Sequence, residues 1–273
     1  MDTVASTGGS ATGLMAPALA DLRATWARAW LVRALGWSDI RRQFSGSFLG
    51  PLWHTLNILI LTTALAVLFG GALGAGHPGY LPYVGIGLVM WQFIQRVMSE
   101  SCHVFVGAAE VLRNSPLPLS LQVFRLVWRN ALLMAHNLVV VLVLLMFLGQ
   151  AAVPHWTILP AAALELAMAT GAAMLLGLAA ARWRDVTQFV TNGMQLLFFV
   201  SPVFWYPRSL FPGREWLIQA NPVAAFIEIM RAPLLGTAAS GSSWLIALAL
   251  SLGALSAALW MLAINRTRLV YWV

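Results

Sequence analysis

Long apolar runs with few charges alternate with short polar connections along most of the chain. Six of these runs are about as long as a helix needs to cross a bilayer, which takes roughly 20 residues. We place them at about residues 51–73, 80–107, 121–149, 156–181, 186–206 and 243–265. The pattern predicts an all-α integral membrane protein with six transmembrane helices.

A segment with regularly spaced apolar residues precedes the first run. Between residues 20 and 46, apolar side chains recur every three or four residues, and several arginines fall off this stripe. The stripe comprises Leu22, Trp26, Trp30, Ala34, Trp37, Ile40 and Phe44. This spacing predicts an amphipathic helix that lies in the membrane interface rather than across it. A soluble helix that packs on a partner protein would show the same pattern.

The arginines fix the orientation of the predicted spans. If the N-terminus is cytosolic, Arg96 lies within a span, and the far side holds only Arg208, Arg214 and Arg231. The cytosolic side then holds Arg23, Arg28, Arg33, Arg41, Arg42, Arg113, Arg125, Arg129, Arg182, Arg184, Arg266 and Arg268. Because cytosolic loops carry the excess of basic residues, this distribution predicts that both termini are cytosolic. We therefore divide the chain into a disordered cytosolic tail (1–19), the interface helix (20–46) and a six-helix transmembrane domain (47–273).

The connection at residues 201–240 differs from the others because it contains Pro202, Pro207, Pro212, Pro222 and Pro233. These prolines divide it into pieces too short to cross a bilayer. Asn221 and Pro222 form a favourable helix start, with asparagine as the cap and proline at the first helical position. We predict short re-entrant helices between spans 5 and 6, buried in protein or lining a cavity.

The amino-acid composition limits the chemical functions that this chain could have. The chain is 60% hydrophobic and only 9% charged, whereas a soluble domain carries about 25% charged residues. It has no lysine, so no Walker A phosphate-binding loop can form. The five histidines (His54, His77, His103, His136 and His155) lack metal-ligand spacing, and one cysteine, Cys102, allows no disulfide. The net charge of +7 follows from membrane orientation rather than from nucleic-acid binding. The sequence thus predicts no enzyme, metal or cofactor in this chain, and transport energy would come from a gradient or a separate subunit.

Three ionisable residues are predicted within the membrane: Arg96, Glu100 and Glu165. Such residues are costly in lipid and are normally paired or exposed to water. Arg96 and Glu100 are one helical turn apart, which favours a mutual ion pair. A proton relay is the alternative interpretation.

Aromatic residues crowd the far half of the fifth run. An aromatic belt at the membrane surface explains some of them. Rings that stack on sugars along a channel are the functional alternative. The candidate set is Trp53, Trp91, Phe93, Phe198, Phe199, Phe204, Trp205 and Tyr206.

Three stretches together resemble one known family. They are SDIRRQFSGSFLGPLWHTLN (38–57), RWRDVTQFVTNGMQLLFFVSPVFWYP (182–207) and WLIQANPVAAFIEIMRAPLLG (216–236), and the terminal RLVYWV also fits. The chain from about Trp26 to Val273 is similar to the transmembrane subunit of ABC-2-type exporters, in particular the permeases for O-antigen, teichoic acid and capsule.

The resemblance implies a homodimer in the bacterial cytoplasmic (inner) membrane with two copies of a separate ATPase subunit, which would hold ATP and magnesium. It implies a lipid-linked glycan as substrate and no nucleic-acid partner. The positions that would contact the ATPase are Trp37, Asp39, Arg113, Asn114, Ser115, Pro116 and Leu117. The positions that would close the channel on the external side are Pro207, Trp216, Asn221, Pro222, Glu228 and Arg231.

A polyprenyl-diphosphate substrate would bring phosphates to the cytosolic interface, where arginine binds them by bidentate, charge-assisted bonds. We expect this contact at the start of span 1, at Arg41, Arg42, Ser45, Ser47 and Gly50, beside a helix N-terminus. Simple anchoring of the span by its arginines is the alternative. At the level of function, the alternatives are an ABC-2-type exporter of a smaller lipid or drug and a proton-coupled secondary transporter.

Overall fold

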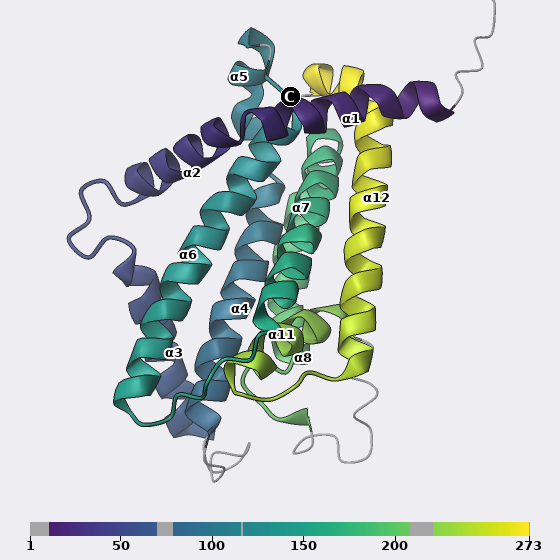
Figure 1. The fold of residues 1–273 in the computed structure, drawn as a ribbon. Coiled ribbons are helices and arrows are strands. Elements are labelled where there is room, and N and C mark those ends of the chain that lie inside the picture. Colours follow the sequence, from purple (N-terminus) through teal and green to yellow (C-terminus); the bar gives the residue numbers. More distant parts are fainter. Residues whose placement is uncertain (1–10, 70–78, 116, 208–220, 273) are drawn as a thin grey trace, which may run out of the picture.

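The computed structural model describes residues 11–69, 79–115, 117–207 and 221–272. Within these ranges the chain is helical, with no strand (Figure 1). The elements in chain order are α1 (Ala11–Ala27), α2 (Ala29–Gln43), α3 (Leu52–Phe69), α4 (Tyr80–Ser101), the 3-10 helix η1 (Val106–Ala108), α5 (Ala109–Asn114), α6 (Ser120–Phe147), α7 (Ile158–Arg182), α8 (Asp185–Val200), α11 (Pro222–Leu234) and α12 (Gly241–Trp272).

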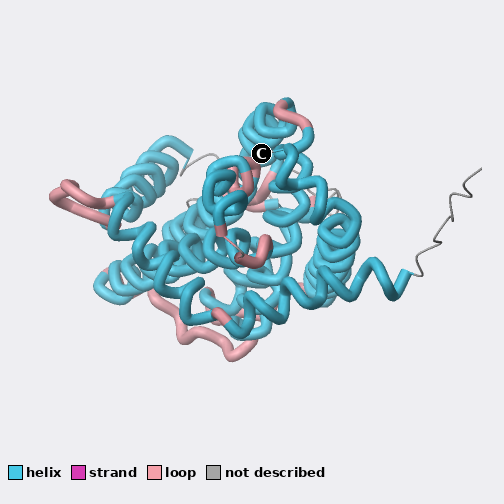
Figure 2. The backbone as a smooth tube through the Cα atoms, turned by 90° about the horizontal axis from the view of Figure 1, so that it is seen from above, coloured by secondary structure: helices cyan, strands magenta, loops and turns pink. Residues whose placement is uncertain are grey.

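Most of the long helices run side by side as one bundle, and α1 and α2 lie across one end of it (Figure 1). Seen from above, the bundle helices appear nearly end-on, and α1 extends past them on one side (Figure 2). We call this end the arginine-rich end, because α1, α2, α5, the start of α6 and the ends of α7 and α12 meet there and carry most of the arginines. The short helix α11 lies near the opposite end of the bundle.

Among the described residues, three helices are long and apolar enough to cross a membrane: Ser120–Phe147, Ile158–Arg182 and Gly241–Leu269. The segment Leu52–Leu68 of α3 is a shorter apolar helix. Over the described ranges the structure therefore confirms an all-helical fold that contains helices able to cross a membrane. Helices α4 and α8 occupy the positions of two further predicted spans, and the count of six remains a prediction.

The N-terminal region differs from our prediction. We expected a disordered tail up to residue 19, yet α1 begins at Ala11, and Ala18 is completely buried. Arg266 of α12 also donates a hydrogen bond to the carbonyl of Pro17 (3.2 Å). The physical reason is that alanine, leucine and methionine favour helix, and α12 provides a surface on which this helix packs. The single predicted helix is also divided, because α1 ends at Ala27 and α2 starts at Ala29.

The three tryptophans of the predicted stripe are largely exposed: Trp26, Trp30 and Trp37 are 78%, 63% and 51% exposed. Ile40, which we placed on the same stripe, is instead buried, as is Val32. An exposed apolar face of this kind suits contact with lipid headgroups or with a partner. Its placement in the membrane interface remains a prediction.

Small residues bring α7 close to its neighbours. A Cβ at Gly177 would lie 2.5 Å from Val104 and 3.0 Å from the Phe105 ring. A Cβ at Gly171 would lie 2.7 Å from the backbone carbon of Ala254 in α12. Glycine at these two positions allows backbones to approach closely, which is how small residues hold membrane helices together.

Candidate functional site

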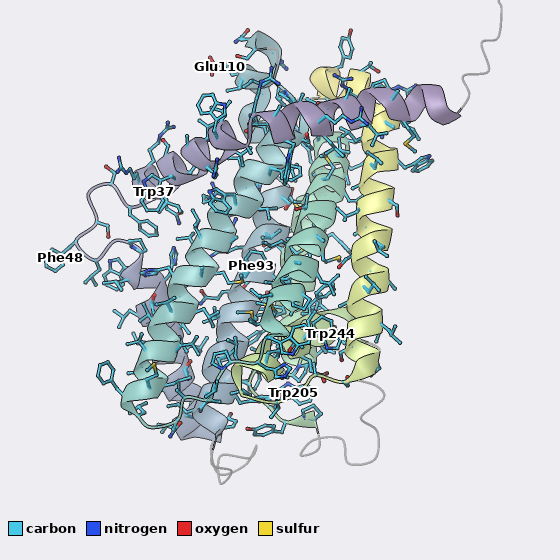
Figure 3. The ribbon with its side chains drawn as sticks, viewed as in Figure 1. Trp37, Phe48, Phe93, Glu110, Trp205 and Trp244 are labelled. Carbon is cyan, nitrogen blue, oxygen red and sulfur yellow. The ribbon has the colours of Figure 1, made fainter. Side chains whose placement is uncertain are left out.

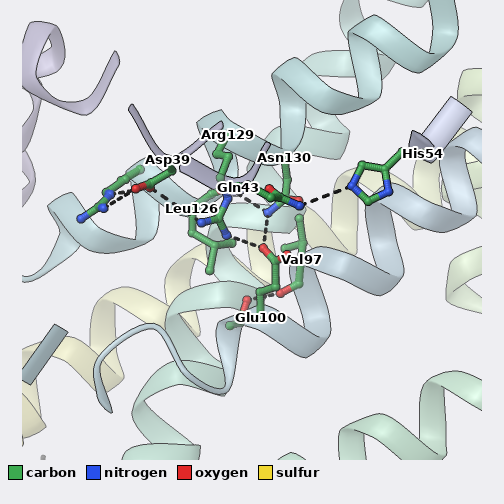
Figure 4. Close-up of polar contacts among 10 residues, drawn as sticks. Asp39, Gln43, His54, Val97, Glu100, Leu126, Arg129 and Asn130 are labelled. Carbon is green, nitrogen blue, oxygen red and sulfur yellow. Dashed lines mark hydrogen bonds and ion pairs between the residues drawn. The ribbon is translucent and has the colours of Figure 1, made fainter. Parts of the chain in front are cut away.

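The candidate site is a network of charged side chains that joins α2, α6 and α4 at the arginine-rich end (Figure 4). Asp39 of α2 accepts hydrogen bonds from Arg125 of α6, at 2.7 Å from Nε and 2.5 Å from Nη2. Arg129, one turn further along α6, places Nη1 3.7 Å from the same carboxylate. A two-pronged arginine–carboxylate contact fixes direction as well as distance, so it holds α2 at one angle to α6.

The network continues into α4 through Glu100. Its carboxylate accepts hydrogen bonds from Arg129 at 2.5 Å and from the Asn130 side chain at 2.7 Å. The predicted Arg96–Glu100 pair does not form, because α6 supplies both donors to Glu100 and Arg96 turns to α3. There Arg96 Nη2 lies 2.6 Å from His54 Nδ1. Figure 4 shows the contacts of Asp39 and Glu100 with α6 and, apart from them, the contact between the side chains of Gln43 and His54 (3.3 Å).

Sequence reasoning missed a second junction, at Asp21 in α1. Its carboxylate accepts hydrogen bonds from the backbone N–H groups of Leu119 and Ser120, both at 2.9 Å. The Thr25 hydroxyl lies 2.7 Å from the Ser120 hydroxyl. Free N–H groups at a helix start need an acceptor, and Asp21 supplies it to α6 from outside that helix. The sequence does mark Asp21 as an acidic residue within an arginine-rich helix. Local patterns cannot identify its partner, because Leu119 is 98 residues away.

A cavity of about 920 Å³ opens beside this network. Helices α2, α5 and α6 and the end of α4 line it, and its charged side chains are Asp39, Arg42, Glu100, Arg125 and Arg129. Asp39 and Glu100 already form ion pairs with Arg125 and Arg129. Of the five charged side chains, only Arg42 forms no ion pair with the described residues. The cavity can therefore accept a polar or anionic group beside Arg42.

The structure separates the two arginines expected at the start of span 1. Arg42 faces the cavity, whereas the Arg41 guanidinium carbon lies 6.0 Å from the centre of the Trp37 ring. The turn that follows is as expected from its glycines: Gly46 and Gly50 have φ of 78° and 54°, values that favour glycine. The Ser47 hydroxyl accepts a hydrogen bond from the Gly50 N–H at 3.1 Å. Ser45 is exposed. The role of these residues in binding diphosphate remains a prediction.

The residues expected to contact an ATPase lie at the same end. Figure 3 shows Trp37 and Glu110 on the outer surface of α2 and α5. Asp39 belongs to the charged network, and Arg113 and Asn114 are exposed at the end of α5. Ser115 and Leu117 are half-buried. Pro116 lies outside the described residues.

The aromatic candidates fall into two groups. Trp53 and Phe199 are 54% and 63% exposed, and Phe198 and Tyr206 are half-buried. The other rings are buried within the chain: Trp91, Phe93, Phe204 and Trp205. Figure 3 shows Phe93 and Trp205 among other side chains of the bundle. In this arrangement the exposed rings are the ones that a glycan could reach, and the buried rings pack the core.

The predicted external residues tie α11 to its surroundings. Asn221 caps α11, accepting from the Val223 N–H at 3.0 Å, and its side-chain amide donates to the Ser201 hydroxyl at 2.9 Å. Glu228 accepts hydrogen bonds from the Ser240 N–H (2.9 Å), just before α12, and from the Ser243 hydroxyl (2.7 Å), in the first turn of α12. Pro222 is the first residue of α11, Pro207 is half-buried, and Trp216 lies outside the described residues.

Arg231, from the same predicted set, is buried at 6% exposure. It donates to the Pro202 carbonyl and to the Tyr83 hydroxyl, both at 2.8 Å, and its guanidinium carbon lies 3.6 Å from the centre of the Tyr83 ring. Tyr83 of α4 was not predicted, because nothing local to its apolar run marks it as a partner of Arg231. These contacts hold α11 against α4 and the segment after α8.

The described residues contain no group of three or more His, Cys, Asp or Glu side chains that could hold a metal ion. Cys102 is buried. The site thus offers ion pairs, a polar cavity and an exposed apolar face.

A bundle with helices able to cross a membrane, and with its arginines gathered at one end, defines a multi-helix integral membrane protein. The comparison with known sequences is more specific. The chain belongs to the ABC-2 type transporter family, whose sequence model matches residues 31–235. Members of this family are membrane subunits of transporters, and the ATPase activity lies in a separate subunit.

Three characterised relatives share this likeness, and each is named an O-antigen export system permease protein RfbA. Two are from Klebsiella pneumoniae, and the first is 24% identical over 192 residues, which cover 69% of this chain and 74% of the relative. The second is 23% identical over 192 residues. The third, from Myxococcus xanthus, is 24% identical over 198 residues, covering 71% of this chain and 76% of the relative.

Proposed function

We propose that this chain is the membrane subunit of an exporter that moves a lipid-linked polysaccharide across the bacterial cytoplasmic membrane. The observation that carries the proposal is membership of the ABC-2 type transporter family, together with relatives that are O-antigen export permeases over about 70% of the chain. A separate ATPase supplies the energy. The arginine-rich end faces the cytosol, as the positive-inside rule requires, and two copies of the chain enclose the path.

The charged network gives this subunit a means of receiving motion from an ATPase. Helix α5 and the exposed face of α2 lie at the arginine-rich end, where an ATPase would dock. Asp39 links α2 to α6, and Glu100 links α6 to α4. Because these contacts are short and paired, displacement of α2 is passed to two helices of the bundle rather than absorbed locally.

The cavity beside Arg42 and the turn before α3 are our candidate for the diphosphate headgroup. Arg42 lines the cavity without an ion pair among the described residues, so its charge is available to a phosphate. Arg41 belongs to the same last turn of α2, and the N-terminus of α3 lies beyond the connecting turn. A headgroup in the cavity would meet the Arg42 guanidinium at the depth where lipid headgroups lie.

Deletion of the gene tests the proposed function. We expect loss of surface polysaccharide and accumulation of the lipid-linked glycan in the cytosolic leaflet, both reversed by the wild-type gene. Unchanged surface polysaccharide in the deletion strain would reject the proposal.

The headgroup contact is tested by Arg41→Gln/Arg42→Gln. We expect this variant to insert in the membrane and to bind its ATPase, but to export less than a tenth of the wild-type polysaccharide. Arg28→Gln/Arg33→Gln is the matched control, because it removes the same charge from two exposed arginines of α1–α2. Equal export by both variants would show that the arginines serve only to orient the span.

A further inference from the structure

Glu165 of α7 lies in surroundings that the proposed export cycle does not use. Its side chain is buried at 3% exposure, although it belongs to a helix that is apolar enough to cross a membrane. Its Oε2 atom has no hydrogen-bond partner among the described residues, and no ion pair to them is present. A buried carboxyl oxygen without a hydrogen-bond partner is costly, so its presence calls for a partner beyond the described residues.

The carboxyl borders a cavity of about 180 Å³. Every other side chain in the lining is apolar, and helices α4, α7, α8 and α11 all contribute, through residues such as Phe93, Val97, Met168, Met194 and Phe226. Methionine side chains adapt to the shape of a ligand. A cavity of about 150 Å³ lined by such residues holds benzene, so this one holds a single ring with a small substituent.

The combination of one carboxyl and an apolar lining selects the occupant. A metal cation needs several oxygen ligands, and the lining side chains offer those of Glu165 alone. A bound water needs roughly two to four polar partners, and Glu165 is the one polar side chain in the lining. A hydrocarbon chain would leave the carboxyl without a partner. A small apolar amine satisfies both features, because its nitrogen pairs with the carboxyl and its hydrocarbon part fills the cavity.

We propose that this cavity is a binding site for a small apolar primary amine, with Glu165 as its counter-ion. The pair is neutral overall whether the proton stays on the carboxyl or moves to the nitrogen, so binding adds no net charge to the membrane interior. The amine reaches the site from the lipid as the neutral base. Phe93 and Phe226 also line the cavity, and an aromatic face attracts an ammonium group.

Occupancy would also affect α11. Pro222 and Val223, at the N-terminus of α11, line the cavity together with residues of α4 and α7. A ligand in contact with all three helices stabilises α11 against the bundle. The inference does not depend on the transported substrate.

The test is equilibrium dialysis of radiolabelled benzylamine and toluene against the purified full-length protein in lipid nanodiscs, with empty nanodiscs subtracted. We expect one saturable benzylamine site per chain, with at least tenfold tighter binding than toluene. Glu165→Gln keeps the side-chain shape and should weaken benzylamine binding at least tenfold while leaving toluene binding within twofold. Ala169→Leu, which fills the cavity from α7, should abolish binding of both.

Several results would overturn the proposal. They are equal binding of benzylamine and toluene to the wild-type protein, no saturable site above empty nanodiscs, or unchanged benzylamine binding in Glu165→Gln. If Glu165→Gln also loses toluene, its cavity has collapsed, and the wild-type preference for benzylamine over toluene alone decides the question.

Discussion

Replacement of Asp39 by asparagine should release α2 from the bundle. Asparagine has nearly the same shape, so the substitution removes charge and leaves packing unchanged. In the wild-type protein the carboxylate receives two hydrogen bonds from Arg125, at 2.7 and 2.5 Å. In the variant both arginines of the network, Arg125 and Arg129, lose their ionic contact to α2. Only Arg129 keeps a carboxylate, that of Glu100.

The structure sets the size of the effect. The Asp39 and Arg125 side chains are 12% and 25% exposed, so the pair lies between a buried ion pair and a surface one. Hydrogen bonds to charged groups contribute about 1.5–3 kcal/mol, and exposed ion pairs contribute about 0.2–1 kcal/mol. We therefore expect a loss of about 2 kcal/mol in the free energy that holds α2 closed, which is roughly 30-fold in its opening equilibrium.

Amide hydrogen exchange measures this opening directly. The amides of Val32 and Ile40, on the buried face of α2, should exchange about 30-fold faster in Asp39→Asn. Asp185→Asn is the control, because it removes an exposed carboxylate at the first turn of α8 and should leave α2 unchanged. In a double-mutant cycle, Arg125→Gln should add little to Asp39→Asn. Less than a twofold change in exchange, or fully additive effects of the two substitutions, would refute the reasoning.

Two further predictions concern stability, measured as unfolding of the purified protein in detergent with increasing dodecyl sulfate. Gly171→Ala should destabilise the protein by about 1–3 kcal/mol, because the added Cβ would lie 2.7 Å from the Ala254 backbone. The control Gly253→Ala has nothing within 4 Å of its Cβ, so it should be neutral or stabilising by up to about 1 kcal/mol. Equal effects of the two substitutions would contradict the packing of α7 on α12. Arg231→Gln should lower the free energy of unfolding by about 2–4 kcal/mol, because two hydrogen bonds and a cation–π contact are lost. The control is Arg268→Gln, which replaces an exposed arginine. Wild-type stability of Arg231→Gln, or the same loss in the control, would contradict the anchoring of α11.

The long apolar helices could be predicted from the sequence because burial in lipid depends on average hydropathy over many residues. The run placed at 121–149 corresponds to α6, and the run at 156–181 to α7. The Asn221-Pro222 start was confirmed to the residue, because cap chemistry is local to a few positions.

Contacts between helices could not be predicted in the same way. Glu100 lies one turn from Arg96, yet it pairs with Arg129 of α6, because the rotation of α4 against α6 decides which partner is nearer. Asp21 caps α6 from α1, and Tyr83 meets Arg231 from α4. Each of these pairs is distant in the sequence, so hydropathy and local spacing carry no information about it.

ATP-dependent movement of lipid-linked polysaccharide into inverted inner-membrane vesicles tests the central claim most directly. Vesicles that contain this chain and its ATPase should protect the glycan from an added glycosidase when ATP is supplied, and vesicles that lack the chain should not. Protection that is equal in both kinds of vesicle, or that a proton gradient drives without ATP, would contradict the account.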